Sequence, residues 1–273
     1  MNTAFETHEP VQLFVAIGRG SVTLSAADTT ESTVHVTGEH SDDTTVELDG
    51  NQLRVLGPKH RTGFFGGEPH LDVTVVVPTH SELAVKTGSA DIQASGAWGS
   101  SQIRSGSGTV QVDQIDAPAL IETGSGSINA EQILGETRIK SGSGDVIVQR
   151  AGGACAVSTG SGDVKVTHSS GPLVVKTGSG DLRVATADGD VSMSTGSGDA
   201  VVDRLTRGNF TVKGASGDVA VGVPQGVPVW TDITSVSGQV HSNLVGAGTP
   251  TDGQEHIELR AKTVSGDVIL KQL

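Results

Sequence analysis

A Gly-Ser-(Gly/Ala) group recurs every 18 residues through the middle of the chain, and this fixed step constrains the fold more than any other feature. Glycine also recurs every nine residues within the step, and apolar residues usually follow it two and four positions later, as in Val146 and Val148. An apolar-x-apolar pair is typical of a β-strand, and a short fixed period is typical of a repeat architecture. The seven groups begin at Gly88, Gly106, Gly124, Gly142, Gly160, Gly178 and Gly196.

The apolar positions form columns when residues 18 apart are aligned. Residues between the paired apolar positions are mostly polar, so one side of each strand should face the interior and the other should face water. We therefore predict an all-β fold, a parallel β-helix (solenoid) of a single chain, with two strands in each 18-residue rung and about 4.8 Å between rungs. Each turn of chain should add a rung to the one before it. The two columns are Val85, Ile103, Ile121, Ile139, Val157, Val175, Met193 and Ile92, Val110, Ile128, Val146, Val164, Leu182, Ala200.

The period also predicts how the chain is divided. Residues 1–80 lack the nine-residue step but contain alternating runs at 11–17, 21–25, 33–37, 45–48, 52–56 and 71–77, so we predict an N-terminal β cap stacked on the solenoid. Residues 81–273 should form the parallel β-helix, with regular rungs to about residue 205. The motif restarts at Ser216, Ser237 and Ser265 at wider spacings, which predicts irregular rungs with insertions.

Composition and charge exclude several classes of function. The chain of 273 residues has 38 glycines, no tyrosine and 3% aromatic residues, so its core should be a slender stack of aliphatic side chains. A formal net charge of -13 argues against binding of nucleic acid through phosphate neutralisation and against docking on an anionic membrane. No stretch approaches the roughly 18 apolar residues of a membrane span. The first ten residues carry Glu6, His8 and Glu9 without an apolar run, so we expect no signal peptide and a cytoplasmic protein.

Two kinds of side chain recur at the corners. Thr or Ser precedes each group, as in Thr159 and Thr177, and should form an inward hydroxyl ladder that satisfies itself and the turn backbone. Aspartate follows the last glycine of four consecutive turns. Carboxylates about 4.8 Å apart repel, so either each one caps its own turn through backbone N–H groups or the file binds calcium. The four candidate calcium ligands are Asp145, Asp163, Asp181 and Asp199.

Two further features of the sequence are candidate sites. Phe64 and Phe65 lie in the long irregular loop between Gly57 and Pro69, where they could form an apolar contact for a partner or fold back over the core. Cys155 is the single cysteine, which excludes an intrachain disulfide, and its column predicts a buried apolar role.

No catalytic signature appears in the sequence. The chain has no G-x-S-x-G elbow, no Walker A loop and no helical pair of histidines at zinc-ligand spacing, and its Gly-Ser-Gly groups lead into strands rather than helices. Some parallel β-helices cleave acidic polysaccharides with clustered Asp, Lys and Arg on one face. Here Arg138, Lys165 and Arg183 are scattered among neutral residues, so a polysaccharide-active enzyme is an alternative and not the main prediction.

The repeated Thr-Gly-Ser-Gly-Asp-(Val/Leu)-x-Val at 159–166 and 177–184 resembles the bacterial candidate-adhesin family of β-strand-repeat proteins, a domain of unknown function. The segments 71–78, 83–91 and 264–268 share the likeness. The resemblance implies a parallel, right-handed β-helix with no established activity. We therefore predict a non-catalytic scaffold or adhesion-like binding surface for a protein or glycan partner, with no cofactor, no nucleic-acid partner and no membrane insertion. A calcium-binding β-roll is the first alternative.

Overall fold

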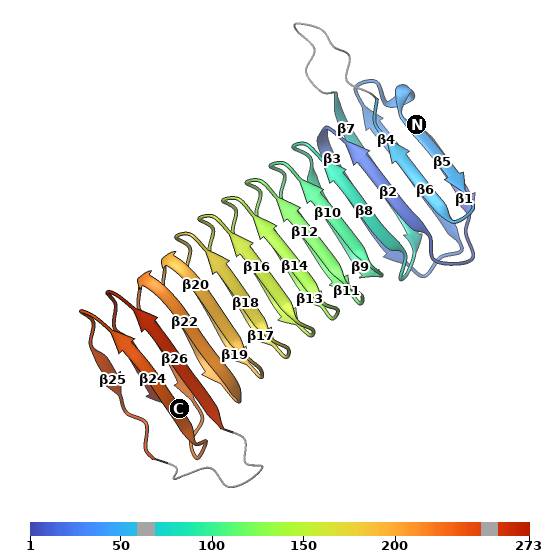
Figure 1. The fold of residues 1–273 in the computed structure, drawn as a ribbon. Coiled ribbons are helices and arrows are strands. Elements are labelled where there is room, and N and C mark those ends of the chain that lie inside the picture. Colours follow the sequence, from blue (N-terminus) through green and yellow to red (C-terminus); the bar gives the residue numbers. More distant parts are fainter. Residues whose placement is uncertain (59–68, 247–255) are drawn as a thin grey trace, which may run out of the picture. The chain divides into compact units, whose positions relative to one another are not determined.

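The computed structural model describes residues 1–58, 69–246 and 256–273, and nearly all of its regular structure is β-strand. A single short 3-10 helix, Ser41–Asp43, is present, and these ranges contain no α-helix. The strands form two compact units, residues 1–136 and 137–273. Within each unit, strands stack mainly in parallel in two sheets, which confirms the predicted all-β solenoid (Figure 1).

Unit 1 (residues 1–136) contains two sheets, here called 1A and 1B. In spatial order, 1A holds β1 (Asn2–Glu6), β4 (Glu31–Gly38), β7 (His70–Pro78), β3 (Arg19–Ala27), β9 (Asp91–Trp98), β11 (Val110–Ile115) and β13 (Ile128–Ile133). Sheet 1B holds β12 (Ala119–Thr123), β10 (Ser101–Ser105), β8 (Glu82–Thr87), β2 (Gln12–Ile17), β6 (Gln52–Leu56) and β5 (Thr45–Asp49).

Unit 2 (residues 137–273) contains sheets 2A and 2B. Sheet 2A holds β15 (Val146–Ala151), β17 (Val164–Ser169), β19 (Leu182–Ala187), β21 (Ala200–Leu205), β23 (Val219–Val223), β27 (Val268–Gln272) and β25 (Val240–Ser242). Sheet 2B holds β24 (Val229–Ser235), β26 (Ile257–Thr263), β22 (Gly208–Ser216), β20 (Val191–Ser197), β18 (Leu173–Thr177), β16 (Cys155–Thr159) and β14 (Thr137–Ser141).

The predicted apolar columns are the core of both units. In unit 1, Ile103 lies in register with Val85 on one side and Ile121 on the other. In unit 2, Val164 is paired in the same way between Val146 and Leu182. All of these side chains are buried, while the residues between them in each strand face outward. The alternation therefore places one face of each sheet in the core and leaves the other for contact with solvent or a partner.

The corner glycines are required by the close stacking of rungs. A Cβ atom built on Gly180 would lie 2.0 Å from the carbonyl oxygen of Gly162, and one on Gly162 would lie 2.2 Å from that of Gly144. Neither glycine has a positive φ, so glycine is needed at these positions for the close approach of the backbones and not for a left-handed conformation.

The order of the rungs departs from our prediction near both chain ends. In unit 1, β2 lies between β6 and β8, so the first rung of the chain is enclosed by later ones. In unit 2, β26 lies between β22 and β24 (Figure 1). In the other sheet, β27 lies between β23 and β25. The expectation that each turn adds a rung to the preceding one is therefore wrong at these places.

In unit 2, the inward residues explain why β26 and β27 are enclosed while β24 and β25 lie at the end. Thr231 of β24 is in register with Leu259 of β26, and Ser242 of β25 is in register with Leu270 of β27. Burying an unpaired hydroxyl costs free energy, whereas burying leucine is favourable. The rung with Thr231 and Ser242 thus lies at the end, where both remain exposed, and the leucine-bearing rung is enclosed.

The N-terminal segment adds antiparallel strands to this parallel stack. β1 pairs with β4, β4 with β7 and β5 with β6, all antiparallel. The alternating runs predicted between residues 11 and 77 are all strands, while β1 was not predicted. The division into a cap of residues 1–80 and a solenoid of residues 81–273 stays a prediction.

Candidate functional site

The aspartate file links neighbouring rungs. The Asp163 backbone N–H donates to Asp145 Oδ1 at 2.9 Å, and the same bond joins Asp181 to Asp163 and Asp199 to Asp181. Asp218 N–H donates in turn to Asp199 Oδ1 at 2.7 Å. Each carboxylate therefore accepts the N–H of the next rung and not that of its own turn. The prediction that each aspartate caps its own turn is wrong.

The turn itself is capped by the Ser/Thr column. Gly162 N–H donates to Thr159 Oγ1 at 3.0 Å, and Gly180 N–H donates to Thr177 Oγ1 at 2.8 Å. Each hydroxyl thus bonds to a backbone group three residues ahead in its own corner. Six members of the column are buried, as predicted, whereas Thr195 is half-buried and its Oγ1 has no hydrogen-bond partner among the described residues.

The calcium hypothesis stays a prediction. Among the described residues, no group of three or more His, Cys, Asp or Glu side chains has the arrangement that could hold a metal ion. One oxygen of each aspartate in the file already accepts a backbone hydrogen bond. Carboxylate oxygens and turn carbonyls remain the ligand type that calcium prefers, so the file is the place where a calcium effect would originate.

The other predicted residues divide between those the structure describes and those it does not. Phe64 and Phe65 lie outside the described residues. Cys155 is 2% exposed in β16, and burial without a charged partner raises the pKa of its thiol to about 12. A thiol in this environment is an apolar core residue and not a nucleophile.

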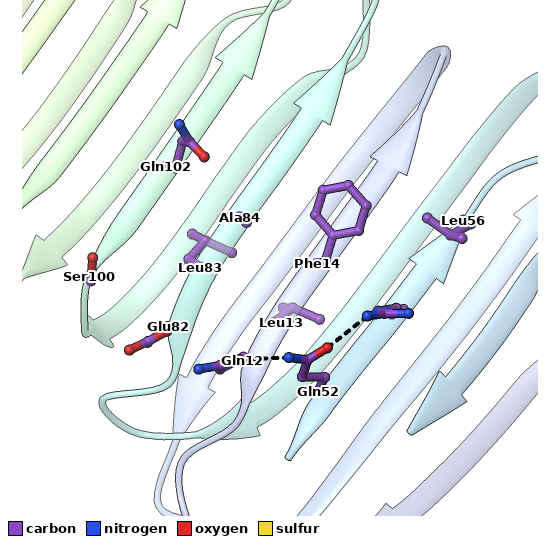
Figure 2. Close-up of a pocket in the computed structure, with 11 residues that line it drawn as sticks. Gln12, Leu13, Phe14, Gln52, Leu56, Glu82, Leu83, Ala84, Ser100 and Gln102 are labelled. Atoms are coloured by element: carbon purple, nitrogen blue, oxygen red, sulfur yellow. Dashed lines mark hydrogen bonds between the residues drawn. The ribbon is translucent and has the colours of Figure 1, made fainter. Parts of the chain in front are cut away.

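Sequence reasoning missed a groove on the outer face of sheet 1B. It has a volume of about 550 Å³ and lies over β2, β6, β8 and β10 (Figure 2). We call it the 1B groove. Its lining residues are Gln12, Leu13, Phe14, Gln52, Arg54, Leu56, Glu82, Leu83, Ala84, Ser100 and Gln102.

The groove exists because a large outward side chain stands beside a small one. Phe14 of β2 is paired across the sheet with Arg54 on one side and with Ala84 on the other, and Ala84 is paired with Gln102. The methyl group of Ala84 leaves a hollow between the Phe14 ring and the Gln102 amide. The Phe14 side chain projects from its strand and is 37% exposed (Figure 2).

Polar groups are fixed along one side of the groove. Gln52 Nε2 donates to Gln12 Oε1 at 3.3 Å, and Arg54 Nη2 donates to Gln52 Oε1 at 2.7 Å. Arg54 also lies 3.6 Å from the Glu47 carboxylate. These contacts orient the amides and the guanidinium at the surface, where the remaining donors and acceptors face solvent.

The composition of the groove favours binding over hydrolysis. Glu82 is the single carboxylate among its lining residues. Hydrolysis of a glycosidic bond normally uses two carboxyl groups on opposite sides of the bond. The lining supplies an aromatic ring, amides and one guanidinium, which can hold a ligand but do not form an acid–base pair.

The family of the chain is shown by comparison with family models. The model described as Toastrack DUF4097 matches residues 12–188 and, in a second match, residues 167–272. The chain belongs to the Toastrack DUF4097 family. This agrees with the β-solenoid seen here and with the family resemblance carried by the Gly-Ser-Gly-Asp corners, and the Toastrack domain has no assigned function.

Several solved structures are similar to this Toastrack chain over nearly their whole length. A candidate lipid-binding protein of Parabacteroides distasonis has 13% identity and a TM-score of 0.45, covering 100% of this chain and 96% of its own. A candidate adhesin of Bacteroides fragilis has 13% identity and a TM-score of 0.35, with 98% and 96% covered. A candidate adhesin of Parabacteroides merdae has 12% identity and a TM-score of 0.38, with 99% and 95% covered.

No curated protein matches the chain significantly. In the part of the Toastrack chain that the structure describes, no helix has the length and apolarity needed to cross a membrane.

Proposed function

We propose that this protein is a non-catalytic binding module and that the 1B groove binds a glycan. The observation that supports this most directly is Phe14, a large aromatic side chain on the outer face of a sheet, surrounded by amide side chains. Only 3% of the residues in the chain are aromatic, so an outward phenylalanine is an unusual use of this residue type. Its exposed ring offers an apolar surface to a ligand and does not contribute to the packing of the core.

A sugar ring matches this surface chemically. Its C–H face is apolar and can lie against the Phe14 ring, while its hydroxyls both donate and accept hydrogen bonds. The amides of Gln12, Gln52 and Gln102 also supply both donors and acceptors, and Arg54 adds further donors. A shallow apolar floor with a few fixed polar groups is the usual form of a small-ligand site.

The rigid sheet also suits binding. The groove lies on four hydrogen-bonded strands whose inward residues, including Val15, Leu53 and Val85, are buried. A site built on sheet strands loses little conformational entropy when a ligand binds, so weak individual contacts can produce useful affinity. This supports a role in recognition or adhesion.

The test is a glycan array followed by calorimetry on the best ligand, with Phe14→Ala as the main variant. We expect at least about a tenfold loss of affinity, because removal of a central aromatic anchor commonly costs 1.4 kcal/mol or more. Alanine already occupies the neighbouring outward position 84, so the variant should fold.

The matched control is Val174→Ala, which truncates another outward apolar residue, 40% exposed, in sheet 2B. It should leave glycan affinity unchanged. Equal affinity of the Phe14→Ala variant and the native chain would contradict the proposed site. The absence of any glycan ligand, together with a protein ligand that depends on Phe14, would assign the groove to a protein partner instead.

A further inference from the structure

Positive charge is concentrated in unit 2 although the whole chain is acidic. Residues 137–273 contain 12 of the 18 lysines and arginines but only 13 of the 31 acidic residues. Six of these aspartates belong to the corner file and are thus kept off the sheet faces: Asp145, Asp163, Asp181, Asp199, Asp218 and Asp267.

Three lysines form a line across the outer face of sheet 2B. Lys176 of β18 is in register with Ser194 of β20, Ser194 with Lys213 of β22, and Lys213 with Lys262 of β26. We call this the lysine file. Neighbouring strands lie about 4.8 Å apart. Lys176 and Lys213 are two strands apart, whereas Lys213 and Lys262 are on adjacent strands. All three side chains are exposed.

The carboxylates on the outer face of sheet 2B, Glu258 and Asp232, lie beside Arg260 and not in the column of the lysine file. Within the ranges 137–246 and 256–273, no carboxylate forms an ion pair with Lys176, Lys213 or Lys262. Like charges opposite each other on adjacent strands are destabilising, and Ser194 shows that a neutral residue fits this column. A ligand of opposite charge would turn this unfavourable arrangement into a favourable one.

We propose that the lysine file binds an extended, carboxylated polysaccharide. A polymer with one carboxylate on each repeating sugar presents charge at regular intervals, which matches lysines that are themselves placed by a regular strand spacing. The hydroxyls of Ser192, Ser194 and Thr211 lie among the lysines on the same face and can bond to sugar hydroxyls. This site is separate from the 1B groove and does not depend on it.

Two features favour a polysaccharide over other polyanions. Each lysine is followed five residues later by a corner aspartate, as in Lys176 and Asp181 or Lys213 and Asp218. A broad anionic surface such as a membrane or a duplex would therefore also approach the aspartate file and be repelled. Single-stranded nucleic acid is normally held by aromatic stacking. This face offers one aromatic ring, that of Trp230, and Arg260 Cζ already lies over it at 5.4 Å from the ring centroid.

The experiment measures binding of the full chain to polygalacturonate at several salt concentrations, with neutral dextran as the uncharged probe. The test variant replaces Lys176, Lys213 and Lys262 with serine, the residue already found at position 194 of the column. Each lysine near an anionic surface contributes about a factor of five, so the triple variant should bind roughly 100-fold more weakly. The slope of log affinity against log salt should fall by about two to three.

The matched control replaces Arg150, Lys165 and Lys271 with serine, which removes the same charge from sheet 2A. It should bind polygalacturonate nearly as well as the native chain, and so should Phe14→Ala, whose defect belongs to the 1B groove.

Three outcomes would overturn the proposal. The first is no binding of polygalacturonate by the native chain, and the second is an equal loss in both triple variants. The third is binding of poly(dT) or of phosphatidylserine vesicles through the same lysines at equal or higher affinity, which would assign the file to nucleic acid or to a membrane.

Discussion

At the corners 159–163 and 177–181, two oxygen-bearing side chains divide the backbone donors between them. Thr177 accepts the N–H of Gly180 within its own turn, whereas Asp181 accepts the N–H of Asp199 on the next rung. The hydroxyl is short and buried, so it reaches only its own turn. The carboxylate is exposed and points along the stack, where its oxygen lies 2.8 Å from the next backbone nitrogen. The Thr-Gly-Ser-Gly-Asp motif therefore encodes both the turn and its attachment to the neighbouring turn.

Replacement of Asp181 separates the hydrogen bond from the charge. Asp181→Ala removes the acceptor of the Asp199 N–H and should lower the free energy of unfolding by about 0.5–1.5 kcal/mol in urea titrations. Asp181→Asn keeps an amide oxygen and reduces repulsion within the file, so it should cost less. If asparagine costs as much as alanine, the charge itself is required. If millimolar calcium then raises the melting temperature of the native chain but not of the asparagine variant, the calcium hypothesis holds.

Cys155 should couple stability to alkaline pH. Burial raises its pKa to about 12 in the folded protein, compared with about 8.5 in an unfolded chain. The unfolded state therefore loses its thiol proton first, and the stabilisation of the folded state by the neutral thiol is lost as pH rises from about 8.5 toward 12. The free energy of unfolding should fall by up to about 1.4 kcal/mol per pH unit in this window.

Urea titrations at pH 8 and 10 check this, with Cys155→Ala as the control that lacks the titrating group. The native chain should lose more stability between the two pH values than the alanine variant does. A native thiol that reacts with a thiol reagent as fast as the unfolded chain would contradict the buried assignment.

At the scale of strands and rungs, the period in the sequence predicts local structure but not the order of the rungs. The 18-residue register follows from the repeat itself, since Val146, Val164 and Leu182 each occupy the same place in their turn. The repeat makes all rungs similar, so it contains little information on which of them is enclosed. That choice depends on single inward residues such as Thr231 and Ser242, whose significance emerges only when they are compared with Leu259 and Leu270.

The candidate groove was unpredictable for a related reason. Phe14 meets Arg54 and Ala84 because β2 lies between β6 and β8, an arrangement that the chain order does not suggest. The groove residues come from four strands that are not consecutive, and no spacing pattern connects them. The lysine file had a visible sequence signal, because Lys176, Lys213 and Lys262 each precede a corner aspartate by five residues. The whole-chain charge of -13 obscured it.

At the scale of the whole chain, residues near each terminus form a rung that is enclosed between two other rungs of the same unit. β2 and β3 of unit 1 are paired on both sides, and so are β26 and β27 of unit 2. A terminal rung would expose one edge and could fray, whereas an enclosed rung has hydrogen-bonded neighbours on both edges. Stability in each unit should thus depend strongly on a segment at the end of the sequence.

Deletion of residues 256–273 tests this dependence in unit 2. The deletion removes Leu259 and Leu270 from between two rungs, so the inward faces of β22 and β23 become exposed or must pack against β24 and β25. In the second case Thr231 and Ser242 become buried, and the truncated chain should unfold at a clearly lower urea concentration. Replacing both residues with leucine in the truncated chain should restore about 2 kcal/mol per site, because the direct contact then buries leucine. The same substitutions in the full chain should have little effect, since both positions lie at the exposed end. If the truncated chain is as stable as the full chain, the enclosed rung contributes no more to stability than a terminal rung does, and the prediction is wrong.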